Sequence, residues 1–311
     1  MWGNPSPTTD AGVRAANLRN NQPIYICSPN ARAKNPMKNN REINPNRHIP
    51  LAGGSNFRDV GGYVAADGRR VRWNTVYRSG ALSRLQADDW RWFVERDIGA
   101  VCDLRSDQER ELAPTMWQGG QRTEHLGVAY AAELIFTPRS PEMTATNVNE
   151  MHHSLYSLFP RLLAPSFRAM FDALISERVP LIVHCSAGQD RTGLAIGLLL
   201  TALGVPRETI LEDYLLSTDF RRVENELDHH GLAHLSDRNI VARFYAQRIA
   251  QQGFEVMRAR PLVNKAGEPL LLGAFAAISD EWGSIEGYLD QELGMGAQRI
   301  ALLRENCLEK I

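Results

Sequence analysis

One stretch in the second half of the chain combines a thiol, a guanidinium and two glycines: His184-Cys185-Ser186-Ala187-Gly188-Gln189-Asp190-Arg191-Thr192-Gly193. An apolar run at 180–184 predicts a buried strand before it, and an apolar pattern at 192–203 predicts a helix after it. A loop that closes on a helix N-terminus directs backbone N–H groups inward, and the helix dipole adds partial positive charge there. We therefore expect this loop to bind an anion.

Cys185 and Arg191 supply the chemistry of the predicted loop. The N–H donors, the helix terminus and a nearby guanidinium all favour thiolate over thiol, so Cys185 is the expected nucleophile. Arg191 can offer a planar fork to two phosphate oxygens and follow the charge through an in-line transition state. Thr192 can stabilise the sulfur as a leaving group through its hydroxyl. The segment lacks the Gly-Lys-Ser/Thr ending of a nucleotide-binding Walker loop.

The predicted binding residues for a phosphoryl group are those of the loop: Ser186, Ala187, Gly188, Gln189, Asp190 and Arg191. Such chemistry needs no metal and no organic cofactor.

The elements that position the loop alternate between strand and helix. Short apolar runs at 75–77 and 100–104 predict buried strands, with a helical pattern at 85–96 between them. A second helix is expected from about 166 to 176. This order predicts an α/β fold with a central, mainly parallel sheet flanked by helices. Residues 206–260 are charged and amphipathic, and we expect them to form a helical insertion that can cover the pocket.

Length and composition fit one enzyme-sized domain with an additional arm. The chain has 311 residues, of which 43% are hydrophobic and 23% charged, close to the averages for globular proteins. Residues 1–50 are rich in Asn and Pro and are expected to form a partly irregular N-terminal arm. Residues 51–311 are the expected catalytic domain. Within it, 112–150 are predicted to be long loops around a strand at 124–128.

Charge and cysteine spacing exclude several classes of function. The formal net charge is -1, from 35 basic and 36 acidic residues, so no global field favours nucleic acid or an anionic membrane. The cysteines are too far apart in sequence to predict a zinc site or a redox dithiol. We find neither a secretory signal pattern nor an apolar run long enough to be a transmembrane segment. The expected location is cytoplasmic, with secretion by a signal-less route left open.

The loop resembles the His-Cys-x-Ala-Gly-Lys-Asp-Arg-Thr-Gly motif of the atypical bacterial and fungal tyrosine/serine phosphatases, a branch of the protein tyrosine phosphatase superfamily. The likeness extends over roughly residues 50–295. It includes four further motifs: Asn56-Phe57-Arg58-Asp59-Val60-Gly61-Gly62, Tyr77-Arg78-Ser79-Gly80-Ala81-Leu82, Asp103-Leu104-Arg105-Ser106 and Trp282-Gly283-Ser284.

This resemblance implies a metal-independent phosphocysteine mechanism on a protein tyrosine phosphatase-like fold. The implied substrates are phosphotyrosine proteins, with phosphoserine/threonine (dual specificity) as a second activity, and phosphate, sulfate or vanadate should bind in the loop. Phosphatases of this superfamily protonate the leaving oxygen with an aspartate, so the resemblance implies two candidates for the general acid. Match to the family's loop favours Asp190, whose structural alternative is to brace the loop or bind Arg191. Asp103 ends a predicted strand, and its alternative is a salt bridge or a helix cap. Gln189 stands where lysine is common, which implies a weaker preference for multiply phosphorylated inositol lipids. A phosphoinositide or small phosphomonoester substrate is the alternative; retention of Cys185, Arg191 and Thr192 argues against a catalytically inactive phosphate-binding module.

Three further groupings have a structural and a functional interpretation. Arg58 and Asp59 are expected to pair and hold the loop. Glu226, His230 and His234 recur every four residues and could share a helix face, but a solvated surface is favoured and no metal site is predicted. Cys102 could form a protective disulfide with the loop cysteine, although a core position is favoured.

Overall fold

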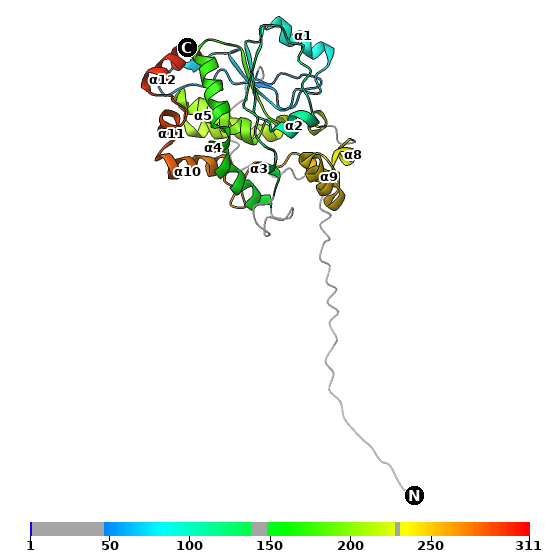
Figure 1. Ribbon diagram of the computed structural model, residues 1–311. Helices are drawn as coiled ribbons and strands as arrows, with labels where there is room; N and C mark the ends of the chain where they lie inside the picture. Colours follow the sequence, from blue (N-terminus) through cyan, green and yellow to red (C-terminus); the bar gives the residue numbers. More distant parts are fainter. Residues whose placement is uncertain (2–46, 138–147, 228–230) are drawn as a thin grey trace, which may run out of the picture. The chain divides into compact units, whose positions relative to one another are not determined.

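A five-stranded sheet lies at the centre of the described chain (Figure 1). The strand order is β1-β3-β6-β4-β5, and every neighbouring pair is parallel except β1 with β3. The predicted α/β fold with a mainly parallel sheet is therefore confirmed. The strands of this sheet are β1 (Arg58–Asp59), β3 (Val76–Ser79), β4 (Ala100–Asp103), β5 (Glu124–Leu126) and β6 (Leu181–His184).

The computed structural model describes Met1 and residues 47–137, 148–227 and 231–311. Most of the predicted N-terminal arm, 1–50, lies outside the described residues, and so does His230 of the predicted Glu/His grouping. Chain contacts assign Asn44–Ile311 to one compact unit. Among the described residues, no helix has both the length and the apolar character needed to cross a membrane.

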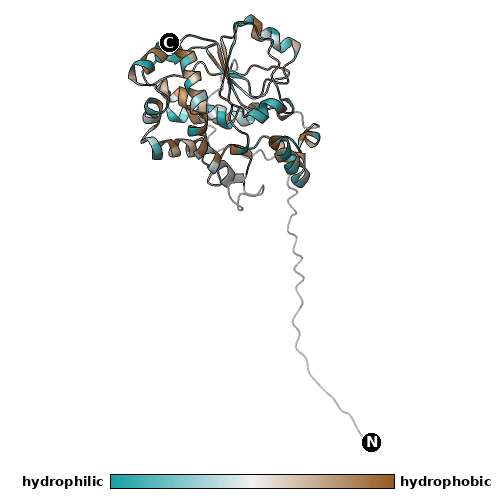
Figure 2. Cartoon of the chain, in the orientation of Figure 1, coloured by the Kyte–Doolittle hydropathy of each residue, from teal (hydrophilic) through white to brown (hydrophobic). Residues whose placement is uncertain are grey.

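Side chains of the three central strands alternate between two hydrophobic clusters. Tyr77, Val101 and Ile182 pack on one side with the aromatic residues of α1. Their apolar strand neighbours pack on the other side, with residues of α4 and α5: Val76, Ala100, Cys102, Leu181 and Val183. This two-residue alternation buries both faces, as a parallel sheet covered by helices requires. Figure 2 shows hydrophobic residues along these central strands.

Helices surround the sheet, and most of the chain that follows β6 is helical. They are α1 (Ala87–Glu95), α2 (Asp107–Leu112), α3 (Glu133–Phe136), α4 (Val148–Ile175), α5 (Asp190–Ala202), α6 (Arg207–Leu215), α7 (Ser217–Phe220), α8 (Leu232–Leu235), α9 (Ile240–Gln252), α10 (Leu271–Trp282), α11 (Ile285–Gln291) and α12 (Ala297–Cys307), with short 3-10 turns η1 (Val223–Asn225) and η2 (Phe254–Met257).

Helix α4 begins well before the predicted start near residue 166. Pro160 and Pro165 lie inside it, and each proline removes a backbone donor and is expected to interrupt a helix. Phe159, Leu163 and Phe167 recur every four residues and are buried in the main core. Packing of this apolar face explains why the helix continues through both prolines. The prediction of long loops over 112–150 is therefore wrong at its C-terminal end and also at 133–136, where α3 forms, whereas the strand expected at 124–128 is present as β5.

The segment 206–260 consists of two different parts. Helix α6 belongs to the body of the domain, because Ile210 and Tyr214 are buried in the main core. Helix α9 instead packs in a smaller cluster, where Val241 contacts residues of α2 and α3. Figure 1 shows α8 and α9 beside α2 and α3, apart from α10–α12. Of the predicted insertion, α9 therefore lies where it can line the pocket over the phosphate loop, whereas α6 packs behind the loop.

A small second sheet joins the two ends of the domain. β2 (Arg70–Val71) pairs antiparallel with β7 (Leu308–Glu309). The predicted turn at Asp67-Gly68 forms, with Val64 and Arg70 bridged across it. The C-terminal residues thus close the domain against its first hairpin.

Candidate active site

The phosphate loop follows β6 and leads into α5, as the sequence predicts. Register places Ser79 and Asp103 beside His184 at the carboxyl ends of three adjacent strands, and Cys185 comes next in the chain. Gly188 has φ +66, and a Cβ there would lie 2.5 Å from backbone atoms of Ser79. Only glycine therefore permits the loop to turn this close to β3.

Donors outside the loop bind three of its carbonyl groups. Asn56 Nδ2 donates to the carbonyls of Ala187 (3.2 Å) and Gly188 (2.8 Å), and Arg78 Nη2 also donates to Gly188 at 2.9 Å. The N–H of Ala81 donates to the carbonyl of Ser186 at 2.9 Å. Because the C=O and N–H of a trans peptide point in opposite directions, the following N–H groups point to the inner side of the loop. Within the described chain those N–H groups have no acceptor, which leaves them available for an anion.

A buried ion cluster fixes the donors behind the loop. Asp213 of α6 pairs with both Arg78 and Arg58, and all three side chains are almost completely buried. Burial opposes ionisation of Asp213, but Arg78 and Arg58 lower its pKa to about 2. The predicted Arg58–Asp59 pair does not form: consecutive strand residues face opposite sides, and Asp59 accepts instead from the backbone N–H groups of Gly61 and Asn74.

Arg191 is held along one edge by a carboxylate that the sequence analysis did not identify. Its Nη1 and Nη2 donate to the two oxygens of Glu109 at 2.6 and 2.7 Å, and Nη1 also reaches Tyr130 Oη at 2.8 Å. Burial opposes the charge on Glu109, but Arg191 lowers its pKa to about 2. The Nε N–H and the second Nη2 N–H of Arg191 have no partner in the described residues, so this edge of the guanidinium remains available to bind two oxygens of an anion. The signal for Glu109 was present as a capping box, Ser106-x-x-Glu109, after the strand.

Asp190 lies at the mouth of the loop with one oxygen engaged. Its Oδ1 accepts from Tyr156 Oη at 2.6 Å, and Tyr156 in turn contacts Tyr214 Oη. Asp190 also lines the pocket above Cys185. Thr192 Oγ1 is buried and has no hydrogen-bond partner in the described chain, so the bond to sulfur that the sequence predicts is not made here.

Asp103 is engaged in ion pairs. Arg105 contacts both of its oxygens, at 2.8 to 3.2 Å, and Arg110 lies 3.6 Å away. Burial opposes ionisation, but His184 and the two arginines hold the pKa of Asp103 below its usual range. Burial lowers the pKa of His184 to about 4. Asp103 does not line the pocket, and its surroundings are those of a structural carboxylate.

A pocket of about 200 Å³ opens over the loop, with Cys185 and Arg191 in its wall. Cys185 itself is 2% exposed. The opposite wall comes from α3, α9 and η2. Cys102 is free and buried, and its Sγ contacts the carbonyl of Ser166 at 3.6 Å, in agreement with its favoured core position.

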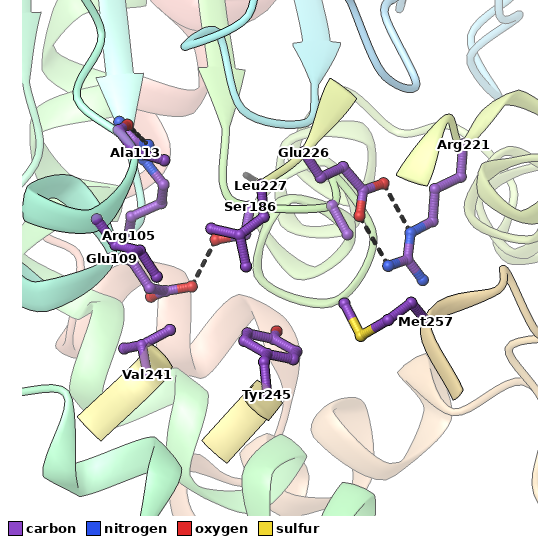
Figure 3. A pocket seen from close by; sticks show the side chains of 12 residues that line it. Arg105, Glu109, Ala113, Ser186, Arg221, Glu226, Leu227, Val241, Tyr245 and Met257 are labelled. Carbon is purple, nitrogen blue, oxygen red and sulfur yellow. Dashed lines mark hydrogen bonds and ion pairs between the residues drawn. The ribbon is translucent and has the colours of Figure 1, made fainter. Parts of the chain in front are cut away.

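A smaller cavity of about 40 Å³ lies beside the first (Figure 3). Figure 3 shows Ser186 pointing to Glu109 on one side, Arg221 bound to Glu226 on the other, and Tyr245 of α9 between them. Arg221 Nη1 also donates to Gln189 Oε1 at 3.0 Å. Glu226 of the predicted Glu/His grouping is thus occupied by an arginine, and the described residues contain no cluster of metal ligands.

Comparison with known proteins agrees with this geometry. The chain matches the tyrosine phosphatase family over residues 49–309. It is 31% identical over 243 residues to a Cupriavidus necator protein named as a candidate tyrosine-protein phosphatase, covering 77% of this chain and 81% of that protein. It is 30% identical over 195 residues to the triple specificity protein phosphatase PtpB of Mycobacterium tuberculosis (54% and 68%), and 28% identical over 240 residues to a tyrosine-protein phosphatase of Nostoc commune (73% and 72%). The chain belongs to the tyrosine phosphatase family.

Proposed function

We propose that the protein hydrolyses phosphotyrosine in proteins through a phosphocysteine intermediate on Cys185. One arrangement carries the proposal: the carbonyls of the loop are bound from outside, its N–H groups point inward, and the open edge of Arg191 shares a pocket with Cys185. Similarity to a phosphatase named for triple specificity supports phosphoserine and phosphothreonine as further substrates.

In the first step Cys185 Sγ attacks phosphorus, so an S–P bond forms while the P–O bond to the leaving group breaks. The loop N–H groups and the Nε–Nη2 edge of Arg191 bind the non-bridging oxygens, where charge develops. Asp190, protonated at the start, gives its proton to the leaving oxygen. The products are the free hydroxyl compound and phosphocysteine.

In the second step water attacks phosphorus and the S–P bond breaks. Asp190 takes the proton of the attacking water, and inorganic phosphate and the Cys185 thiolate are released. Thr192 supports this step, because its unpartnered hydroxyl can rotate to donate to the departing sulfur. Neither step calls for a metal ion.

Asp190 is the better of the two candidate acids. It borders the pocket and keeps one carboxylate oxygen free of the Tyr156 contact. Asp103 is bound by two arginines that favour its ionised form, and a general acid must carry a proton when the substrate binds. We assign Asp103 to positioning the loop from β4.

The first test is hydrolysis of p-nitrophenyl phosphate with EDTA present. Cys185→Ser should abolish turnover, whereas Cys102→Ser, the same change at a buried strand position outside the pocket, should retain it. Vanadate and phosphate should inhibit the wild type by occupying the loop. Turnover that persists in Cys185→Ser, or that depends on an added metal, would refute the mechanism.

A cytoplasmic location is part of the proposal. The three cysteines in the described residues are free and buried, which is consistent with a reducing compartment. Fractionation of producing cells, with activity measured in each fraction, tests it.

A further inference from the structure

Four arginines from the segment that follows α6 line the pocket above the loop: Arg221, Arg248, Arg258 and Arg260. Arg221 and Arg258 each form an ion pair with a glutamate of the same segment, at 2.7 Å in both cases. Within the described chain, Arg248 and Arg260 have no carboxylate partner. The pocket therefore contains two uncompensated guanidinium groups besides the loop itself.

Arg248 is unusual because it is both charged and buried. It is 9% exposed, and its guanidinium carbon lies 5.3 Å from the centroid of the Phe244 ring. Burial lowers the pKa of Arg248, Tyr245 opposes this, and the like charge of Arg260 lowers it further. A partly desolvated cation without a counter-charge is less stable than a solvated one. An anion between Arg248 and Arg260 would offset the desolvation and the repulsion between the two guanidinium groups.

The position of Arg248 relates this pair to the reacting phosphoryl group. Tyr245 precedes Arg248 by three residues on α9, so the two share one helix face. Tyr245 lines the larger pocket together with Cys185 and Arg191 and the smaller cavity together with Ser186, which places it beside the loop. Arg248 is therefore about one helical turn, roughly 5 Å, further along the pocket than the residue that borders Arg191. An extended peptide covers that step in one or two residues.

Aromatic side chains form the wall between the two sites. Phe136, Phe244 and Tyr245 pack edge to face, with centroids 5.3 to 6.1 Å apart, and all three line the pocket. Such a wall can pack against the aryl ring of phosphotyrosine. An inositol ring would direct hydroxyl groups at these apolar faces and lose hydrogen bonds to water. The wall thus favours a peptide over an inositol lipid.

We propose that Arg248 and Arg260 form a second anion-binding subsite, which takes an acidic side chain or a second phosphate one or two residues from the phosphotyrosine of a peptide substrate. This specificity rests on the proposed function, since the phosphotyrosine itself must occupy the loop. Arg248 contributes the buried charge, and Arg260 covers the anion from the exposed side of the pocket.

The test uses phosphotyrosine peptides that differ only in the flanking residues: Asp or Glu, a second phosphorylated residue, or Asn and Gln. The wild type should have kcat/KM about tenfold higher for either anionic peptide than for the neutral one, as expected for one charge-assisted hydrogen bond. Arg260→Met, an exposed change that leaves the core intact, and Arg248→Met should each bring the ratio close to one. Arg248→Lys should restore part of it.

Arg243→Met is the matched control, because Arg243 is an exposed arginine of α9 outside the pocket; it should keep the wild-type ratio. A ratio that survives both Arg248→Met and Arg260→Met would overturn the subsite. A wild-type kcat/KM ratio near one would also overturn the subsite. If Cys185-dependent turnover of the neutral peptide is seen in that case, the proposed function stays intact. Absence of Cys185-dependent turnover of every peptide would overturn both. A larger loss in Arg260→Met on a short-chain phosphatidylinositol bisphosphate than on the anionic peptides would assign the subsite to lipid and overturn the peptide assignment.

Discussion

Replacing Glu109 by Gln tests whether the buried carboxylate orients the catalytic arginine. Glu109 binds two N–H groups of Arg191 and also accepts from Ser106 and Ser186. The amide keeps the volume but turns one acceptor into a donor that faces a guanidinium N–H. The folded-state pKa of Glu109 is about 2, against an ordinary 4.5, and this difference corresponds to about 3 kcal/mol of stabilisation at neutral pH. We expect a loss of about 2–4 kcal/mol in the free energy of unfolding.

The effect on catalysis should exceed a general loss of stability. A guanidinium displaced by about 1 Å costs roughly 100-fold in turnover, so Glu109→Gln should lower kcat by about 10- to 100-fold and weaken vanadate inhibition. Urea unfolding, kcat and vanadate inhibition would be measured below the temperature at which the variant unfolds. Glu111→Gln, an exposed change on the same helix, is the control. A destabilised Glu109→Gln that keeps wild-type kcat and vanadate inhibition would refute the orienting role.

Three further outcomes are expected. Arg191 and Arg78 depress the folded-state pKa values of Glu109 and Asp213 to about 2, from ordinary values of 4.5 and 3.8. These carboxylates therefore stabilise the fold at a pH above those ordinary values, and urea midpoints should fall as the pH drops from about 4.5 through 2. A urea midpoint that stays constant over this pH range would contradict the assignment. Gly188→Ala should abolish phosphate binding along with activity, since the new Cβ would lie 2.5 Å from β3; phosphate binding retained in a calorimetric titration would count against the tight turn. Asp190→Asn should lose most kcat/KM on phenyl phosphate and little on p-nitrophenyl phosphate, while Asp103→Asn should show no such leaving-group dependence; the reverse pattern would exchange their roles.

The sequence was sufficient to predict the elements whose structure depends mainly on residues close to them in the chain. The strand before Cys185, the helix after it and the neighbouring strand that ends at Asp103 were all predicted from short apolar runs. The loop's anion-binding geometry could be expected because it depends on its own backbone and on the helix that it starts.

Sequence was insufficient where distant residues determine the outcome. Nothing local to Arg58 indicates that its partner is Asp213, 155 residues later, rather than its neighbour. The capping box Ser106-x-x-Glu109 gives Glu109 a sufficient local role, so nothing local indicates its contact with Arg191. The early start of α4 depends on the core contacts that compensate Pro160 and Pro165. In each case a tertiary contact outweighs a correct local preference.

The glutamine in the loop shows how such a contact changes the interpretation of a sequence difference. Taken alone, Gln189 in place of lysine removes a positive charge from the pocket rim. In the structure its side-chain oxygen accepts from Arg221, a contact that a lysine ammonium could not make and would oppose by repulsion. The cation is thus replaced from another element, but Glu226 binds that arginine through both oxygens and neutralises it. The subsite proposed at Arg248 lies further along the pocket. A loop substitution that is expected to weaken a site for clustered phosphates is therefore compatible with the proposed selection of an acidic residue beside the phosphotyrosine.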